Sequence, residues 1–276
     1  MAAGEPVNIK IDESFTGPVC DYSVGFLKVA EDGQIRIPAG TGTFVQLGKT
    51  YGIITAGHVL KELQKGKIGL VRFPSVEPAL QNYTLDLDHT EREVLWEGKE
   101  GEGPDIAFLK IPEIDAKNLL AKGSVFYNLD KERNFSLSNR DHHMAKAHAV
   151  VGVVGEWTEV GPAMQATGKK LIVGGVFGAA KSAREFRENE TDLVEIAVDH
   201  ATGPKVPKSY GGVSGGALWE LHVELDKEKK KVVTVNKKLH GVAFRQSEDH
   251  SLIVSNAAPS IEALKKKIAE RWPDNK

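Results

Sequence analysis

The feature that most constrains the fold is the recurrence of short runs rich in β-branched and aromatic residues, bounded by Gly, Pro, Asn or Asp. Residues 42–47 and 51–55 form one such pair, with Gly48, Lys49 and Thr50 between them as a hairpin turn. Further runs lie at residues 93–96, 105–111, 147–154, 170–176, 193–198, 216–225, 232–236 and 239–244. Runs of this number and spacing are typical of β-barrels or a sandwich rather than of alternating β and α units.

Helical periodicity is clearest near the carboxyl end. The apolar residues Ile261, Leu264, Ile268 and Trp272 recur at steps of three or four, which places them on one face of a helix. Pro259 suits the first turn of a helix. The pattern predicts a helix over residues 259–272 that packs on the β-structure.

Two segments interrupt the strand pattern. Residues 114–139 show no clear period, and we place the crossing between two halves of the chain there. Residues 226–231 are a cluster of charges between two strand-like runs, which indicates a solvated hairpin tip.

Composition excludes several classes of function. The net charge of −2 gives no overall field that would recruit nucleic acid or an anionic membrane. No apolar run approaches the ~18 residues of a membrane span, and the first residues have no signal-peptide pattern. Cys20 is the only cysteine, so an internal disulfide is excluded. We therefore expect a cytoplasmic protein with neither a nucleic-acid nor a membrane partner.

The glycine-rich segment 211–216 places one hydroxyl, that of Ser214, in a loop with almost no neighbouring side chains. A serine becomes a strong nucleophile only beside a base. The amides of Gly212 and Ser214 can both point at one developing oxyanion, forming an oxyanion hole. The alternative interpretation is a glycine-rich turn beside a strand.

A base and an acid lie upstream of Ser214. His58 follows a short apolar strand and two small residues, where a turn can direct an imidazole outward. Asp105 precedes a buried strand, and a carboxylate there requires a partner such as a histidine N–H. Asp86 and Asp88 are rival acids, but their alternating context indicates solvent exposure. The order His, Asp, Ser is one of the known chain orders of the Ser-His-Asp triad.

These segments resemble trypsin-like serine peptidases of the disulfide-poor bacterial and viral type. Residues 55–58 are similar to the family's Thr-Ala-x-His, 105–107 to its Asp-Ile-Ala, 212–216 to its Gly-x-Ser-Gly-Gly, and 40–45 to its first glycine-rich strand. The resemblance covers about residues 20 to 270. It implies an all-β, chymotrypsin-like fold: residues 1–130 form a barrel with His58 and Asp105, and residues 131–276 form a barrel with Ser214 and a C-terminal helix.

Two positions depart from the digestive members of the family. Val213 stands where those members have an aspartate that pairs with a newly cut N-terminus, so that activation switch cannot operate. Val59 stands where a cysteine often follows the catalytic histidine, which agrees with the missing disulfides. We expect a triad that is assembled in the full-length chain or gated by a partner.

The resemblance also suggests substrate-binding residues. The strand with Gly241, Val242 and Ala243 would bind an extended peptide through its main chain. His240, at a position similar to the histidine that glutamyl endopeptidases and viral relatives use to bind Glu or Gln, suggests a Glu or Asp preference. A histidine packed in the second barrel is the alternative. Lys208 and Ser209 would also favour an acidic side chain.

No metal or other cofactor is expected. His142, His143 and His148 are near one another in the sequence, but their spacing matches no standard zinc pattern. We interpret them as a polar loop that leads into a strand.

The resulting prediction is a serine endopeptidase that acts on polypeptide substrates. A catalytically silent binding or scaffold module with the same fold is the alternative. An α/β-hydrolase esterase is disfavoured because its triad order is Ser, acid, His. We expect any regulator to be another protein or a second copy of this chain.

Overall fold

The computed structural model of the chain describes residues 19–29, 35–63, 66–72, 82–95, 104–131, 135–136, 138, 142–155, 159–161, 170–172, 175–180, 183–197, 209–226, 228 and 231–274. Most of the regular structure in this part of the chain is β-strand. The strands are β1 (Ser23–Val29), β2 (Ile35–Leu47), β3 (Thr50–Thr55), β4 (Lys67–Arg72), β5 (Asn82–Asp86), β6 (Glu91–Val94), β7 (Ala107–Lys110), β8 (Tyr127–Asn128), β9 (His142–Val153), β10 (Glu159–Gly161), β11 (Lys170–Ile172), β12 (Gly175–Ala180), β13 (Ala183–Glu188), β14 (Thr191–Ala197), β15 (Ala217–Asp226), β16 (Lys231–Gln246) and β17 (Leu252–Asn256). The helices are α2 (Gly57–Glu62), the 3₁₀ turn η1 (Leu87–His89), α3 (Glu113–Ala121) and α4 (Ala258–Arg271).

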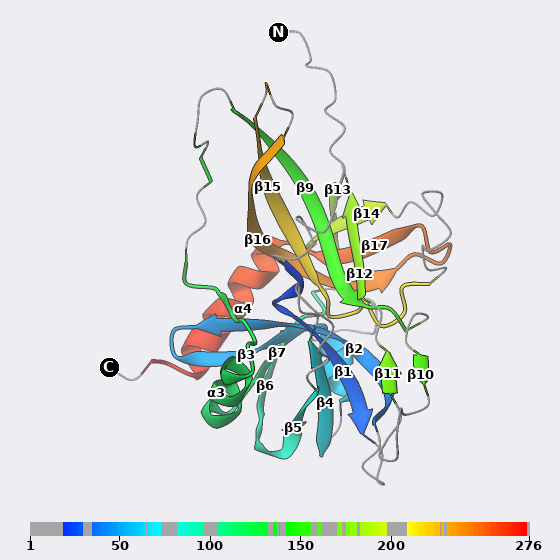
Figure 1. Ribbon diagram of the computed structural model, residues 1–276, viewed down its shortest axis with the longest axis vertical. Helices are drawn as coiled ribbons and strands as arrows, with labels where there is room; N and C mark the ends of the chain where they lie inside the picture. Colours follow the sequence, from blue (N-terminus) through cyan, green and yellow to red (C-terminus); the bar gives the residue numbers. More distant parts are fainter. Residues whose placement is uncertain are drawn as a thin grey trace.

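The first sheet has the strand order β5-β4-β1-β2-β3-β7-β6 and lies in the lower half of Figure 1. All these pairs are antiparallel, and the short β8 adds to β2 in parallel. The two end strands, β5 and β6, are consecutive in the chain and are joined by η1. Because β5 pairs with β4 while β6 pairs with β7, this bent segment joins the two ends of the sheet.

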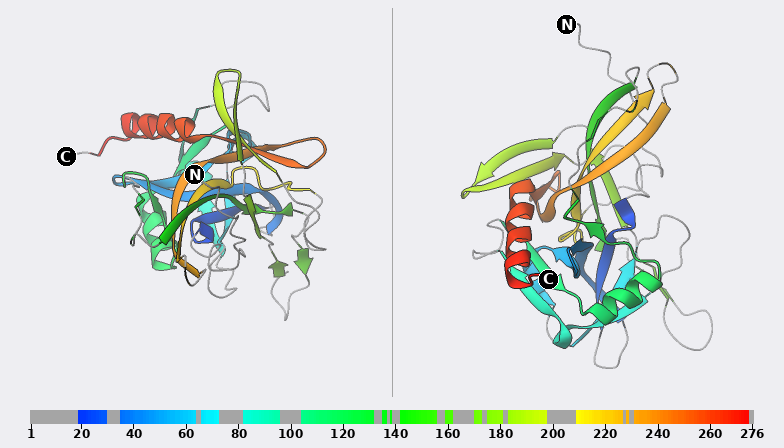
Figure 2. Two further views of the ribbon diagram at one scale, coloured as in Figure 1. Left: turned by 90° about the horizontal axis from the view of Figure 1, so that it is seen from above. Right: turned by 90° about the vertical axis from the view of Figure 1, so that its left-hand side faces the viewer.

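The second sheet repeats this arrangement with the antiparallel order β12-β9-β15-β16-β17-β14-β13. Its end strands, β12 and β13, are again consecutive, and only two residues separate them in the sequence. The long strands β9, β15 and β16 extend upward from the body (Figure 1), whereas the β13–β14 hairpin projects to one side (Figure 2). The prediction of an all-β fold with a C-terminal helix is confirmed, and the two predicted barrels are present as two antiparallel sheets.

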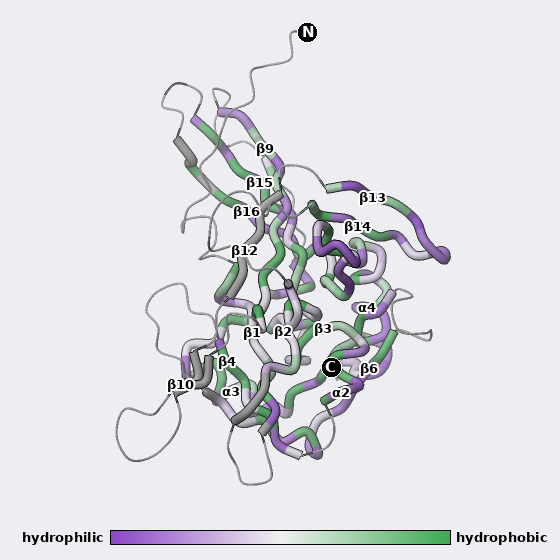
Figure 3. The backbone as a smooth tube through the Cα atoms, turned by 90° about the vertical axis from the view of Figure 1, so that its right-hand side faces the viewer, coloured by the Kyte–Doolittle hydropathy of each residue, from purple (hydrophilic) through white to green (hydrophobic). Residues whose placement is uncertain are grey.

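Aromatic packing joins the two sheets. The buried ring of Trp219 on β15 lies 5.6 Å from the ring centre of Tyr22 and 5.0 Å from that of Tyr127. Trp219 belongs to the same hydrophobic cluster as Phe26 and Phe44 of the first sheet. In Figure 3 the strands alternate between hydrophobic and hydrophilic residues where they cross the body, as expected for sheets with one buried face.

Helix α4 fastens the carboxyl end of the chain to the first sheet. Leu264 and Ile268 are fully buried, so the predicted apolar stripe faces the core. Beyond them, the indole N–H of Trp272 donates to Glu91 at 2.8 Å, and Arg271 pairs with Glu93 at 2.6 Å. The helix therefore covers one side of the molecule (Figure 2).

Most of the predicted strands are found in the structure, with altered boundaries. The hairpin of residues 42–55 and the charged tip after Asp226 are confirmed. The runs 232–236 and 239–244 form one strand, β16, and the run 170–176 is divided between β11 and β12. Residues 114–139, which show no clear period in the sequence, nevertheless include most of helix α3. The boundary between residues 130 and 131 stays a prediction.

None of the described helices has the length and apolar character that crossing a lipid bilayer requires.

Candidate active site

His58 and Asp105 form a close pair where strand β3 ends and strand β7 begins. The Nδ1 atom of His58 lies 2.6 Å from Oδ2 of Asp105, and the backbone N–H of His58 donates to Oδ1 at 2.9 Å. Asp105 is only 2% exposed, whereas the His58 side chain is 21% exposed. An Nδ1–H donor to this carboxylate leaves the Nε2 lone pair as the basic atom of the ring.

The register of two strands brings this pair together. Thr55 at the end of β3 lies opposite Ala107 at the start of β7. His58 comes three residues after Thr55 and Asp105 two residues before Ala107. The antiparallel pairing therefore brings both residues to the same end of the β3–β7 pair. His58 lies in the short helix α2 rather than in the turn that the sequence suggested.

The serine loop, residues 211–216, begins with a tight turn. The N–H of Val213 donates to the carbonyl of Tyr210 at 3.0 Å, and Gly212 has φ +94°. This φ is typical of the third residue of a type II turn, which requires glycine in practice. The loop then continues into β15 at Ala217.

The backbone amides of residues 212–216 in the serine loop fall into two groups. Those of Val213, Gly215 and Gly216 donate to carbonyl oxygens at 3.0, 2.7 and 2.8 Å. In the part of the chain that the structure describes, the amides of Gly212 and Ser214 have no acceptor. These two amides are the pair that the sequence predicts as oxyanion donors, and they are available for that role.

Contacts from both sheets hold the turn of the serine loop. The carbonyl of Gly211 accepts from the N–H of Gly155 at 2.8 Å, which fixes the peptide that carries the Gly212 amide. The Thr41 hydroxyl donates to the carbonyl of Gly212 at 2.8 Å and accepts from the N–H of Val153, also at 2.8 Å. Thr41 is fully buried and therefore links β2, β9 and the serine loop.

Ser214 lies against β2 at the place where β2 also contacts the segment that carries His58. Its carbonyl accepts from the N–H of Thr41 at 2.9 Å. A Cβ placed on Gly40 would lie 3.2 Å from this carbonyl oxygen and 2.7 Å from Val59, the residue after His58. The structure thus brings the serine loop, His58 and Asp105 to one place between the sheets, and the hydrogen bond between Ser214 and His58 stays a prediction.

Apolar packing holds the middle of the serine loop. Val213 is 3% exposed and belongs to the second hydrophobic cluster with Val154, Leu218 and Ala243. At the equivalent position the digestive members of the resembled family use an ion pair. The valine anchors this loop without any charged partner.

The predicted substrate strand is in large part bonded within the protein. Ala243 donates to the carbonyl of Gly216 at 2.8 Å and accepts from Gly215 at 2.7 Å, and the Val242 N–H donates to Asn256 at 2.9 Å. A Cβ on Gly241 would lie 1.7 Å from the carbonyl oxygen of Asn256. Pairing between β15 and β16 stops at Ala217 opposite Val242, while β16 continues to Gln246. Ala243 is thus already bound by the serine loop, and the part of β16 that extends beyond both is residues 244–246.

The remaining specificity candidates are separated in the structure. Ser209 lies just before the serine loop and accepts from the Gly211 N–H at 3.3 Å. Lys208 lies outside the described residues. His240 is 9% exposed and faces Glu220 and His148, with Glu220 Oε2 at 3.9 Å from its Nδ1. Burial is the main cause that lowers the pKa of His240 below its usual value, so the imidazole is neutral at pH 7.

The rival carboxylates have other roles. Asp86 accepts from the Asp88 N–H at 3.0 Å and lies 3.4 Å from His89. Asp88 is exposed. Both residues stabilise the turn η1, and the structure pairs His58 with Asp105 instead.

Two residues of the site had no signal in the sequence. The buried side chain of Asn256 donates to the carbonyls of Pro104 at 3.1 Å and Asp105 at 3.4 Å and accepts from Val242. It therefore links the backbone of the acid to the second sheet. Thr41 was visible only as part of a glycine-rich strand, because its partners lie more than a hundred residues away in the chain.

Comparisons with known proteins add little to this geometry. No protein-family model matches the chain, and no curated protein matches it. One matching solved structure is the inactive form of a serine-to-alanine mutant of Rv3671c from M. tuberculosis H37Rv. The two chains are 14% identical, the match covers 98% of this chain and 99% of that one, and the TM-score is 0.46. Similarity at this level leaves the function of this chain to be inferred from its own residues.

Proposed function

We propose that this protein is a serine endopeptidase in which Ser214, His58 and Asp105 form the catalytic triad. The observation that carries the proposal is the buried Asp105 carboxylate, which accepts both from the His58 backbone N–H and from its ring. This double contact fixes the ring and its tautomer, which is the role of the acid in such a triad.

In the proposed reaction, Nε2 of His58 takes the proton of the Ser214 hydroxyl while Oγ attacks the peptide carbonyl carbon. The resulting oxyanion accepts hydrogen bonds from the Gly212 and Ser214 amides. His58 then gives its proton to the leaving amine, and an acyl-enzyme forms. A water molecule, deprotonated by His58, cleaves the acyl-enzyme and restores the hydroxyl.

A substrate peptide would lie along β16 where that strand extends beyond β15, next to the serine loop. Main-chain pairing of an extended peptide with a strand is a common mode of peptide recognition. This placement replaces Gly241, Val242 and Ala243 of the sequence-based prediction, because β15, Asn256 and the serine loop already contact them.

The test is labelling by a fluorophosphonate, which reacts with a serine only when its base and oxyanion donors are in place. We expect the wild type to be labelled and the Ser214→Ala and His58→Ala variants to be unlabelled, with peptidase activity lowered by about 10⁶. Ser251→Ala is the matched control, because Ser251 lies in a surface turn, and it should react like the wild type.

The outcome that would overturn the proposal is a folded wild type without labelling or cleavage of any peptide library. Near-ultraviolet circular dichroism would establish the fold in that experiment. That result would support the second candidate function, a binding or scaffold module with a peptidase fold.

We further propose a preference for Glu or Asp before the scissile bond. Among the described residues this preference is supported by Ser209 beside the serine loop, whereas His240 already faces the carboxylate of Glu220. Peptide libraries that differ only at this residue give the test, and equal cleavage of Glu, Gln, Asp and Asn would exclude the preference. The polypeptide substrate, a regulatory partner and the cytoplasmic location stay predictions.

A further inference from the structure

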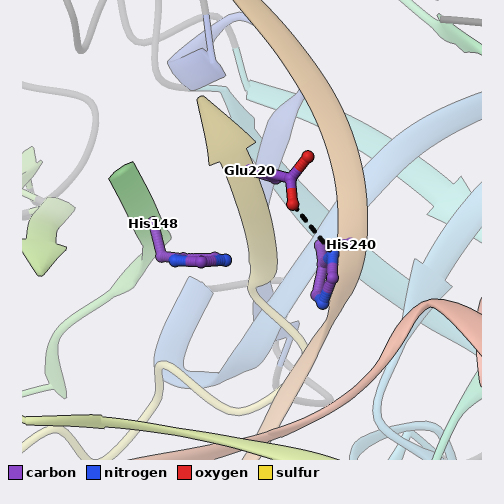
Figure 4. A group of neighbouring side chains, drawn as sticks. All are labelled: His148, Glu220 and His240. Atoms are coloured by element: carbon purple, nitrogen blue, oxygen red, sulfur yellow. Dashed lines mark ion pairs between the residues drawn. The ribbon is translucent and has the colours of Figure 1, made fainter. Parts of the chain in front are cut away.

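Away from the serine loop, three potential metal ligands converge from three neighbouring strands. His148 lies on β9, Glu220 on β15 and His240 on β16 (Figure 4). One ligand atom from each residue lies within 4.8 Å of the other two. Glu220 is the fourth residue of β15, so its Cα lies roughly 13 Å along the chain from Gly216.

Strand register explains two members of this histidine–glutamate cluster. Glu220 and His148 are directly opposite each other in the β9–β15 ladder, so their side chains point to the same face. Leu218, two residues before Glu220, faces the second hydrophobic cluster on that side of the strand. The histidine–glutamate cluster therefore lies on the inner face of the second sheet, next to the apolar core on that face.

A β-bulge supplies the third member. Leu218 pairs with Gly241, but the next residue, Trp219, pairs with Leu239, which leaves His240 as the extra residue of β16. A bulge redirects the side chain of the unpaired residue and bends the strand. Here it directs the imidazole toward Glu220 and His148 instead of along the regular alternation.

The polar atoms of this cluster are incompletely satisfied. Nε2 of His240 is buried and has no hydrogen-bond partner among the described residues. Its Nδ1 lies 3.9 Å from Glu220 Oε2, which is longer than a hydrogen bond. A buried polar atom without a partner is costly, and a cation coordinated through Nε2 of His240 would satisfy that atom while the nearby Glu220 carboxylate balances its charge.

We propose that His148, Glu220 and His240 bind one zinc ion. Two histidines and one glutamate are a typical zinc ligand set that leaves a fourth position for water. Ligand atoms on a tetrahedral zinc lie roughly 3.4 Å apart, so side-chain movements of about 1 Å close the observed site. The ion would join β9, β15 and β16 where the second sheet passes beyond its apolar core.

Neighbouring side chains determine which carboxylate oxygen of Glu220 faces the proposed zinc site. Oε1 of Glu220 is held by the His222 ring, which leaves Oε2 as the atom that faces the site. A hydrogen bond of this kind orients a metal-binding carboxylate. Lys146 also contacts Oε2, at 3.3 Å, but its side chain is 62% exposed and can turn into solvent when the ion binds. This inference reverses the expectation that the chain holds no metal, and it does not depend on peptidase activity.

The test is zinc titration of the full-length chain after removal of metal with a chelator. Calorimetry should give a stoichiometry near one, and saturating zinc should raise the Tm by about 5 °C. Cobalt should give the visible absorption of a four-coordinate N/O site. His148→Ala and Glu220→Gln should each lower zinc affinity at least about 100-fold and remove the Tm increase.

The matched control is His143→Ala, since His143 is an exposed histidine on the same strand as His148. This variant and Ser214→Ala should bind zinc like the wild type. Each variant is compared with its own metal-free form, so a general loss of stability does not imitate a loss of zinc binding. Absence of saturable zinc binding, or binding that His148→Ala and Glu220→Gln leave unchanged, would overturn the proposal.

Discussion

The Thr41 hydroxyl offers a sharp test of how the serine loop is held, because Thr43 provides a matched control two residues away on the same face of β2. Both side chains are fully buried. The Thr41 hydroxyl makes two hydrogen bonds of 2.8 Å, to the Gly212 carbonyl and from the Val153 N–H. The Thr43 hydroxyl has no partner among the described residues. Replacement of either threonine by valine keeps the side-chain volume and removes only the hydroxyl.

The expected magnitudes follow from these contacts. Thr41→Val leaves the buried Val153 N–H unsatisfied, which costs about 1–3 kcal/mol, and also removes a hydrogen bond from the half-buried Gly212 carbonyl. The free energy of unfolding should therefore fall by at least about 1–3 kcal/mol. Thr43→Val removes a buried hydroxyl that has no partner and should be neutral or stabilising by up to about 1–3 kcal/mol. Thr41→Val should also slow fluorophosphonate labelling of Ser214, because the turn that presents the Gly212 amide loses one of its anchors.

Urea unfolding followed by tryptophan fluorescence measures the stability of both variants, and labelling kinetics under native conditions measure the site. Equal unfolding free energies for the two variants would refute the assignment of Thr41 as the link between the sheets. A destabilised Thr41→Val with an unchanged labelling rate would show that the link does not position the serine loop.

Three further predictions concern the acid, the loop backbone and the cysteine. Asp105→Asn should lower the acylation rate by about 10⁴ with the fold retained, because the His58 ring loses its acceptor; an unchanged rate would exclude Asp105 as the triad acid. Gly215→Ala should prevent folding or labelling, since its Cβ would lie 1.9 Å from a backbone oxygen at φ +89°. At Gly66, with φ +97°, an added Cβ would meet no atom of the described residues within 4 Å, so Gly66→Ala should cost only about 1–2 kcal/mol; similar stabilities in thermal unfolding would contradict this. Burial, and secondarily a neighbouring aspartate, raises the pKa of Cys20 from 9.0 to about 11, so alkylation by iodoacetamide at pH 8 should be about 100-fold slower in the folded than in the unfolded chain. For the same reason the contribution of Cys20 to stability is present below pH 9 and is lost as the pH rises toward 11; equal alkylation rates would contradict the assignment.

Short-range patterns in the sequence were sufficient for several parts of this molecule. The glycines at 212, 215 and 216 predicted a tight loop from the sequence alone. In the structure Gly212 and Gly215 have positive φ, which favours glycine. The apolar stripe of α4 follows from helical periodicity alone. The pairing of His58 with Asp105 could be predicted because each lies next to the end of an apolar strand, and a buried carboxylate requires a partner.

Helix α3 shows where local patterns fail. Its residues have weak amphipathic character, and only Ala116 and Leu119 are buried, so the sequence has no distinct periodicity there. The pairing of the end strands was also beyond the sequence, since β5 and β6 follow each other across η1 but pair with different strands, β4 and β7.

The sequence by itself determined that strands dominate, that a helix ends the described chain, and that a hydroxyl, an imidazole and a carboxylate occur in triad order. Tertiary structure alone decided the orientation of His240, because one extra residue in the β15–β16 ladder turns its side chain toward Glu220 and His148. It likewise decided that Thr41 and Asn256 hold the site together. Periodicity within a strand is a local property, whereas a bulge, a register or a bond between two sheets depends on residues that are distant in the chain and meet only when it folds.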